Sequence, residues 1–437
     1  MKKITGVCSL LLLSLMIISS FFVFGASADA SITPPTVENC RAACLYDKTH
    51  GRVLVMENPD TPLNTSTGAK VMMGLLACEL LSDRLDESVT LTDEMLSGAS
   101  GYSMQLKSGE TIKIKDLLYG AICGSYNDAG YAIASICSGS SVGFVSAMNE
   151  RAKALGALST NYTNPLGYPD NDAMKTTLSD TLKIASAASE NSLYMEICSA
   201  KKHEISETNL SGARTVYNRN SLVSSRSTQA YYNPVCSGMN AGISGEAGGW
   251  SVITLARDDG ADYLCIILGG EESEDGRIYA YDAANRLINW ACDTYNLYKV
   301  FDKGQIIGKA EVGLTALGSQ KVDYALSDDL SIYIPDHASP SITYKTRFVS
   351  DKLEAPIKAG EEIGKVSVFC DGEIVGECGV VLLEDCESNV FMKAINALGD
   401  YTKSRAFIAA IVCFAVLLPT VLIVKKNRSR RKYKRRF

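Results

Sequence analysis

Residues 65–73 read TSTGAKVMM, and they open a run of helix-forming residues that ends near Leu81. Thr67 and Lys70 are three positions apart, so at the start of a helix they lie on one face. Backbone amides at a helix N-terminus stabilise a developing oxyanion, and a lysine buried beside them loses part of its proton affinity. The stretch therefore has the chemistry of a hydroxyl nucleophile with a lysine base. The structural alternative is an N-cap cluster followed by an ordinary surface lysine.

Two later stretches carry polar groups in a similar setting. Residues 117–130 read LLYGAICGSYNDAG, where the hydroxyl of Ser125 can pass a proton and the amide of Asn127 can hold a peptide group. A polar loop that caps the next helix explains the same residues. Residues 238–248 read GMNAGISGEAG and precede a strand at Trp250, and glycines in that position are typical of turns.

Helical and strand patterns are mixed in residues 31–296. The sequence predicts strands at 53–56, 250–257 and 263–269, an amphipathic helix at 69–81, and helices at 142–155, 177–190 and 277–296. This order of elements favours a mixed α/β domain with an antiparallel sheet.

The pattern changes near residue 296 to short alternating strands. GQIIGK at 304–309 recurs 56 residues later as GEEIGK at 360–365, each typical of a turn between strands. We therefore expect residues 297–385 to form a small all-β domain built from two similar halves.

Both ends of the chain resemble membrane-handling segments. Residues 1–28 have two lysines, an apolar run and a small-residue cleavage site, which is typical of a signal peptide, although the run is long enough for an uncleaved anchor. Residues 406–424 carry no charge and are long enough to span a bilayer, the alternative being a buried core helix. The tail at 425–437 has nine basic residues, which predicts that it is cytoplasmic and that the body is outside. We expect an apolar-sided juxtamembrane helix at 386–405.

Composition excludes several classes of function. The net charge of -6 conceals an acidic body, with 32 basic and 49 acidic residues between the leader and the tail, which disfavours nucleic-acid binding. There is no C-x-x-C pair, and the three histidines have no ligand spacing, so the sequence predicts neither zinc nor any other cofactor. The twelve cysteines outside the leader and the span permit disulfides, but several lie in apolar runs where a free thiol packs as a core residue.

Taken in order, the three polar stretches resemble the S-x-x-K, S-x-N and K-T-G elements of penicillin-recognising serine enzymes. The surrounding sequence resembles peptidase family S11, the D-alanyl-D-alanine carboxypeptidases or low-molecular-weight penicillin-binding proteins. The likeness covers about residues 36–385 and includes four stretches: GRVLVMEN at 51–58, LLYGAICGSYNDAGYAIA at 117–134, FVSAMNERAKALGALSTNYTNPLGY at 144–168 and AGGWSVITLARDDGADYLCIILGG at 247–270. Class A β-lactamases share the three elements but not these stretches.

The resemblance implies a fold and a role for each site residue. The fold is the β-lactamase/transpeptidase-like one, an antiparallel sheet with helices on both sides. The implied roles are nucleophile for Thr67, general base for Lys70, proton relay for Ser125, substrate binding for Asn127, the K-T-G positions for Asn240, Ala241 and Gly242, and oxyanion-hole amides for Thr67 and Ile243.

This chain departs from the family pattern at three positions. Thr67 adds a methyl group where the family has serine, and Ser66 is an alternative nucleophile because it also shares the face of Lys70. Asn240 and Ala241 lack the cation and the hydroxyl that the family uses. We therefore expect very low carboxypeptidase turnover on peptidoglycan stem peptides ending in D-Ala-D-Ala, and β-lactam binding if the site is active. The alternative is a catalytically inactive homologue that binds stem peptides or a wall protein, in either case on the outer face of the membrane.

Overall fold

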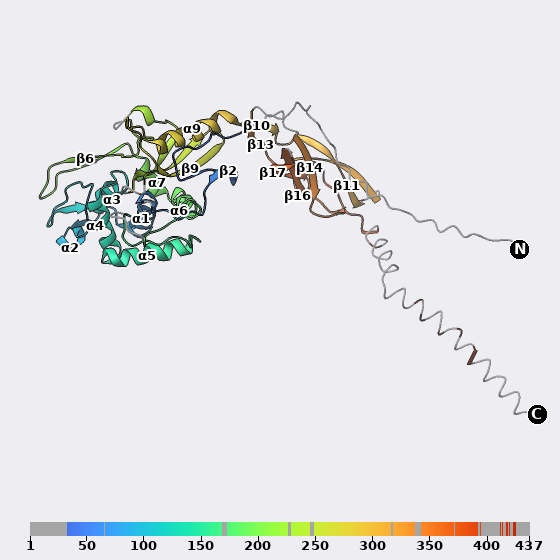
Figure 1. Cartoon of the computed structure of the whole chain (residues 1–437). Coiled ribbons are helices and arrows are strands. Elements are labelled where there is room, and N and C mark those ends of the chain that lie inside the picture. The colour runs from blue at the N-terminus through green and yellow to red at the C-terminus, as the bar shows by residue number, and fades with distance from the viewer. Residues whose placement is uncertain are drawn as a thin grey trace, which may run out of the picture. The chain divides into compact units, whose positions relative to one another are not determined.

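The computed structural model describes residues 33–64, 66–167, 173–225, 229–244, 249–315, 318–336, 342–370 and 372–391, together with Ala394 and six isolated positions between 411 and 424. The described residues form two compact units, divided between Leu297 and Tyr298, except that Tyr333 to Asp336 belong to the first unit (Figure 1).

The first unit is built on a five-stranded sheet. Its strands are β1 (Ala42–Asp47), β2 (Arg52–Glu57), β7 (Cys236–Ile243), β8 (Trp250–Asp258) and β9 (Ala261–Gly270). They lie in the order β2-β1-β9-β8-β7, and each neighbouring pair is antiparallel, which confirms the expected antiparallel sheet. The centre of the sheet joins distant parts of the chain, since Leu45 of β1 lies opposite Cys265 of β9.

Helices cover both faces of this sheet (Figure 1). On one face, α9 (Tyr279–Thr294) packs Ala284, Leu287 and Ile288 against residues such as Leu45 and Ile267. On the other face lie α1 (Ser66–Leu81), α3 (Ile114–Ile122), α4 (Asn127–Ser138), α5 (Ser141–Ala154), α6 (Leu178–Glu190) and α7 (Ser192–Ser199). The short elements are η1 (Ser82–Arg84), α2 (Asp93–Leu96), η2 (Gln229–Tyr231) and the paired strands β3 (Ser88–Thr90) with β4 (Thr111–Lys113) and β5 (Lys202–Ile205) with β6 (Arg214–Tyr217).

Helix α1 differs from the expected amphipathic helix. Thirteen of its 16 residues are buried, on all sides of the helix. A side chain at Gly74 would put its Cβ 2.6 Å from the ring of Tyr194 on α7, so the two helices touch at this glycine. A helix surrounded by other elements needs no polar face, and α1 is therefore the fixed central element that holds the N-terminal residues of the candidate site.

The second unit is all-β, as expected. Its sheet contains β11 (Ile306–Thr315), β12 (Gly318–Leu326), β14 (Ile342–Phe348), β15 (Leu353–Glu354), β16 (Glu362–Cys370) and β17 (Glu373–Leu382), in the order β14-β16-β17-β12-β11-β15. A separate two-stranded sheet pairs β10 (Tyr295–Phe301) with β13 (Leu330–Pro335), and the residues of each strand are divided between the two units.

The sequence repeat corresponds to a structural repeat within this unit. Gly304 and Gly360 both have positive φ and precede β11 and β16. The amide of Gly304 donates to the carbonyl of Leu326 (2.9 Å). The amide of Gly360 donates to the carbonyl of Leu382 (2.8 Å), and both residues of this second contact lie 56 positions after their counterparts in the first. The two hairpins meet at β12 and β17, where Leu326 lies opposite Val380 and Tyr324 opposite Leu382.

The expected membrane-handling segments lie largely outside the described residues. The predicted signal peptide, the basic tail and most of the predicted span fall there. The predicted helix at 386–405 is wrong at its start, because Cys386 and Ser388 form isolated bridges to Ile357 and Thr315; beyond Phe391 only Ala394 of it is described. In the described part of the chain, no single helix is long and apolar enough to cross a membrane, and α4 with α5, bent by 80°, meets those criteria only as a pair. The described cysteines form no disulfide bond with one another.

Candidate active site

The N-terminus of α1 places Ser66 and Thr67 beside the end of β7. The amide of Ser66 donates to Ser244 Oγ (2.7 Å), and its own hydroxyl donates to the carbonyl of Ile243 (3.2 Å). The hydroxyl of Ser66 is thus used in joining the helix to the strand. Thr67 is fully buried, and its Oγ1 has no hydrogen-bond partner among the described residues. Of the two hydroxyls, the one on Thr67 is the unengaged one.

Lys70 and Ser125 form the closest contact of the site. The ammonium of Lys70, one turn into α1, donates to the hydroxyl of Ser125 (2.9 Å) and to its carbonyl (3.0 Å). Burial lowers the pKa of Lys70 to about 8, with a smaller contribution from the positive charge of Arg219. At neutral pH a useful fraction of this lysine is therefore unprotonated and able to accept a proton.

Ser125 has an unusual backbone conformation that explains this double contact. Its φ is 54°, in the left-handed region that non-glycine residues seldom adopt. The conformation turns both the carbonyl and the hydroxyl of Ser125 toward one ammonium group. Gly124 precedes it, and any side chain there would collide with the ring of Tyr126, 2.4 Å from the added Cβ. The turn between α3 and α4 thus depends on a glycine followed by a strained serine.

Asn127 begins α4 and is anchored to a neighbouring loop. Its amide N donates to the carbonyl of Tyr102 (2.7 Å) and its side-chain Nδ2 donates to the carbonyl of Ser100 (2.5 Å). Its Oδ1 is buried and has no hydrogen-bond partner among the described residues. Asn127 therefore has one unused group, an acceptor for an N–H that the fold does not supply.

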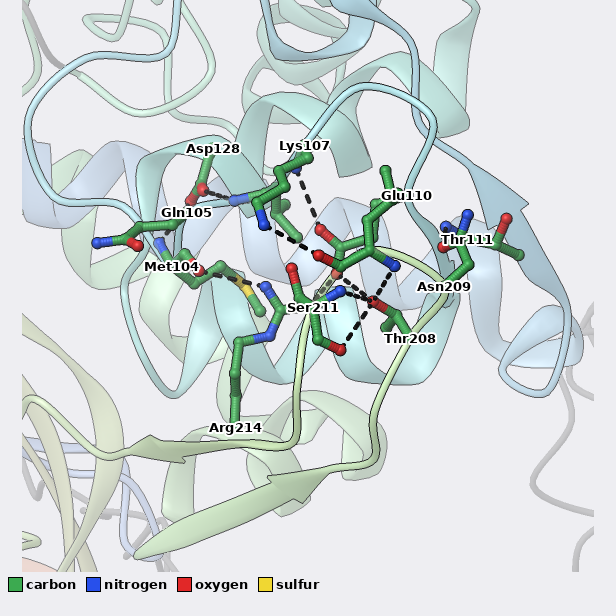
Figure 2. A network of polar contacts seen from close by, with 12 residues as sticks. Met104, Gln105, Lys107, Glu110, Thr111, Asp128, Thr208, Asn209, Ser211 and Arg214 are labelled. Atoms are coloured by element: carbon green, nitrogen blue, oxygen red, sulfur yellow. Dashed lines mark hydrogen bonds and ion pairs between the residues drawn. The ribbon is translucent and has the colours of Figure 1, made fainter.

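The loop that carries Tyr102 is held by two buried carboxylates, which Figure 2 shows. Asp128 accepts from Ser103 Oγ (2.7 Å) and from the amides of Met104 (3.1 Å) and Leu106 (3.0 Å). Glu110 pairs with Arg214 of β6, whose guanidinium also donates to the carbonyl of Met104 (3.3 Å). These contacts fix the loop between α4 and the β5–β6 hairpin.

Strand β7 forms the wall next to Thr67. A side chain on Gly242 would put its Cβ 4.0 Å from Thr67 Oγ1, so this strand passes beside the candidate nucleophile. Asn240 lies opposite Ile253 and Ala241 opposite Val252 on β8, and both are buried, whereas the side chain of Ile243 is half exposed. The reading of 238–248 as a turn is therefore wrong for residues 238–243, which belong to a strand.

One residue of the site was missed in the sequence. Arg219 is exposed, and its guanidinium carbon lies 3.7 Å from the centre of the Tyr102 ring. It follows β6 in a segment without helical or strand periodicity, so no local pattern identifies it. Only the fold brings its charge near Lys70.

The fold brings the predicted site residues close together, but the expected hydrogen bond from the Thr67 hydroxyl is missing. Lys70 and Ser125 are hydrogen-bonded, Asn127 lies two residues beyond Ser125, and Gly242 lies beside Thr67. The Thr67 hydroxyl is hydrogen-bonded to neither Lys70 nor Ser125. In the described residues, no group of three or more His, Cys, Asp or Glu could hold a metal ion.

Known families match both units of the chain. The profile of D-alanyl-D-alanine carboxypeptidase, peptidase family S11, matches residues 29–272. The chain belongs to this family. Residues 295–388 match the C-terminal domain of penicillin-binding protein 5, a second match that corresponds to the all-β unit.

Curated members of the S11 family are similar over nearly the whole chain. D-alanyl-D-alanine carboxypeptidase DacF of Bacillus subtilis is 25% identical over 91% of this chain and 99% of its own length. D-alanyl-D-alanine carboxypeptidase DacD of Escherichia coli is 24% identical over 90% of this chain and 99% of its own length.

Solved structures share the fold of this S11 chain. Penicillin-binding protein 5 of Haemophilus influenzae has a TM-score of 0.60 at 22% identity, covering 82% of this chain and 100% of its own. A peptidoglycan synthesis regulatory factor (PBP3) of Streptococcus pneumoniae has a TM-score of 0.61 at 18% identity, covering 81% and 100%. These likenesses support the transpeptidase-like fold of the first unit.

Proposed function

We propose that this chain is a membrane-anchored D-alanyl-D-alanine carboxypeptidase-type penicillin-binding protein that acts on peptidoglycan stem peptides with low turnover. The observation that carries the proposal is the contact of Lys70 with Ser125 at the N-terminus of α1, where Thr67 lies beside Gly242. A lysine with a lowered pKa, a bridging hydroxyl and a helix N-terminus are the parts that acyl transfer requires.

The proposed reaction passes through an acyl-enzyme. The Thr67 hydroxyl attacks the carbonyl carbon between the two terminal D-alanines, and its proton goes to neutral Lys70. The backbone amides of Thr67 and Ile243 donate to the oxyanion. As the peptide bond breaks, Ser125 passes a proton to the departing D-alanine amine and is reprotonated by Lys70. Water then attacks the ester and releases the shortened peptide.

Two features of the site support slow turnover. The Thr67 hydroxyl is buried and is not hydrogen-bonded to the lysine that would take its proton, so attack requires a rearrangement of the side chain. The β-branch of threonine restricts that rotation. On β7, Asn240 and Ala241 provide neither the charge nor the hydroxyl that the family pattern places there.

Membrane anchoring rests on the sequence pattern of residues 406–437. An uncharged run followed by nine basic residues favours a single span with a cytoplasmic tail, which puts both units next to the cell wall. Alkaline extraction and protease protection of membranes from expressing cells test this topology.

Covalent labelling by a fluorescent penicillin tests the proposed chemistry. We expect slow labelling of the full-length protein that is abolished in Thr67→Ala, because the ester bond requires that hydroxyl. Ser66→Ala is the matched control and should keep labelling within about threefold, since Ser66 only joins α1 to β7. Loss of labelling in Ser66→Ala alone would identify Ser66 as the nucleophile. A folded wild-type protein that is never labelled, yet binds stem peptides, would support the inactive homologue.

The labelling rate should depend on pH through Lys70. Its lowered pKa, about 8, means that the neutral base is a minor species at pH 6 and the major one at pH 9. The rate should therefore rise across this range and level off above about pH 9. Removing a neighbouring positive charge in Arg219→Gln should raise the pKa and move the profile to higher pH. A flat profile would mean that Lys70 is not the base.

A further inference from the structure

The tip of the β5–β6 hairpin is attached to β4 and to the turn before it by polar contacts, in the region that Figure 2 shows. The side chain of Asn209 accepts from the amide of Thr111 (2.7 Å) and donates to the carbonyl of Gly109 (2.8 Å). The ammonium of Lys107 donates to the carbonyl of Leu210 (2.9 Å), whereas the side chain of Leu210 is exposed. Hydrogen bonds require defined distances and angles, so this attachment fixes the hairpin relative to the turn.

Glu110 and Arg214 form the buried part of this attachment. Glu110 is fully buried, and the side chain of Arg214 is only 18% exposed. The guanidinium of Arg214 pairs with Glu110 and also donates to the carbonyl of Met104 (3.3 Å). Because the guanidinium is a rigid planar fork, it holds these two acceptors in a fixed relation. One side chain of the hairpin thus joins both ends of the loop at 104–110.

The loop that Arg214 joins contains a strained residue. Gln105 has a φ of 60°, in the left-handed region that non-glycine residues seldom adopt. The amides of Met104 (3.1 Å) and Leu106 (3.0 Å), on either side of it, donate to the carboxylate of Asp128, while the carbonyl of Met104 accepts from Arg214. A strained conformation persists only where the surrounding contacts fix it. Arg214 and Asp128 therefore hold the turn at Gln105 between them (Figure 2).

The preceding residues of the same loop orient Asn127. The amide of Asn127 donates to the carbonyl of Tyr102 (2.7 Å), and its Nδ2 donates to the carbonyl of Ser100 (2.5 Å). The bond from Nδ2 fixes the orientation of the planar side-chain amide, and with it the direction of Oδ1, a buried acceptor without a partner among the described residues. That direction is set by a loop whose own position depends on the contact between Met104 and Arg214.

We propose that Arg214 is a positioning residue for Asn127. Together with Glu110 it holds the turn at Gln105, and so it fixes the loop carbonyls that direct the Asn127 acceptor toward an N–H of a stem peptide. This inference rests on the proposed function, since it assumes a stem peptide in the site. Arg214 acts only through the loop, so its loss should weaken peptide binding and leave the direct contact of Lys70 with Ser125 (2.9 Å) in place.

The first test removes the ion pair without leaving an unpaired charge, in the variant Glu110→Met/Arg214→Met. Binding of a fluorescent stem peptide ending in D-Ala-D-Ala is measured by anisotropy on the full-length protein in detergent, in a Thr67→Ala background that prevents acylation. We expect the Kd to rise about 10-fold, the effect of losing one hydrogen bond to a buried acceptor. An unchanged Kd in this variant would overturn the inference.

The second test asks whether the pair acts through Asn127. Asn127→Ala should also raise the Kd about 10-fold in the parent protein. In the Glu110→Met/Arg214→Met background it should add less than about twofold, because the acceptor that it removes is already misdirected. Two independent losses that multiply to about 100-fold would overturn the inference. With Thr67 restored, the pH profile of penicillin labelling should be the same with and without the pair, and a shifted profile would show a general disturbance of the site instead.

The matched control is Lys202→Gln/Glu204→Gln, which removes an exposed ion pair (2.9 Å) from the same hairpin. It should leave the Kd and the full effect of Asn127→Ala unchanged. A loss equal to that of the buried pair would show that any change in the hairpin weakens binding, and it would overturn the inference while leaving the proposed function in place. Failure of the parent protein to bind the peptide would overturn the proposed function itself.

Discussion

Restoring the family residues on β7 and at the nucleophile should increase penicillin labelling by at least about 100-fold. The variant Thr67→Ser/Asn240→Lys/Ala241→Thr regains an unhindered hydroxyl, a cation and a hydrogen-bond donor. Each of the two β7 contacts is worth roughly 1.5–3 kcal/mol of transition-state binding, or about 10- to 150-fold in rate. The second-order rate of acylation by a fluorescent penicillin, followed on gels, measures the gain.

Partial variants show how much of the gain in labelling comes from position 67 and how much comes from positions 240 and 241 on β7. Thr67→Ser alone reports the steric effect of the methyl group, and Asn240→Lys/Ala241→Thr alone reports the strand. Circular dichroism checks that the buried lysine is tolerated, since Asn240 is only 6% exposed in the present fold. A triple variant that folds normally and labels no faster than wild type would contradict the proposal that these three positions cause the low turnover.

Removing the buried carboxylate of Glu110 should produce the largest loss of stability. Glu110 is fully buried, and it accepts from Arg214, from Thr208 Oγ1 (2.9 Å) and from the amide of Lys107 (3.1 Å). Glu110→Ala leaves the partly buried charge of Arg214 without its partner. Breaking a buried pair in this way costs up to about 3–5 kcal/mol of unfolding free energy. The double variant Glu110→Met/Arg214→Met should recover much of the loss, because it leaves no unpaired charge.

Tryptophan fluorescence during urea unfolding measures the loss of stability of the first structural unit in Glu110→Ala. The chain has two tryptophans, Trp250 and Trp290, and both lie in the first unit. Asp86→Ala is the matched control, because it breaks an exposed ion pair with Lys113 (3.4 Å) and should leave the unfolding midpoint close to that of wild type. A midpoint for Glu110→Ala equal to that of the control would show that the pair contributes little.

The sequence predicted the helices and strands that can be recognised from the residue pattern of a single segment. The strands at 250–257 and 263–269 and the helices at 142–155 and 177–190 agree with β8, β9, α5 and α6 within one or two residues. The repeat at Gly304 and Gly360 also appears as two equivalent turns. These segments have a clear period or a glycine with a defined role, so tertiary contacts reinforce the local preference.

Other features depended on contacts that no local pattern contains. The glycines of residues 238–248 alone suggest a turn, whereas the family resemblance places Asn240, Ala241 and Gly242 on a strand, and the pairing of β7 with β8 provides that strand. Helix α1 was expected to have a polar face, but it lies between the sheet and other helices. Family resemblance identified Lys70 and Ser125, whose contact the structure shows. Arg219 escaped both approaches, because its place beside Tyr102 is set by hydrogen bonds from Asn218 and Asn220.

The pairing of β1 with β9 has a consequence for how the chain acquires its structure. Leu45 pairs with Val55 in the local β1–β2 hairpin, but the other edge of β1 has no partner until Cys265 of β9 is available, so the sheet cannot be completed during early synthesis. Contacts this distant in sequence slow folding and keep the chain open until most of the first unit has been made. A protein that is exported in an unfolded state would benefit from this delay, because the sheet is completed only after its last strands have been synthesised.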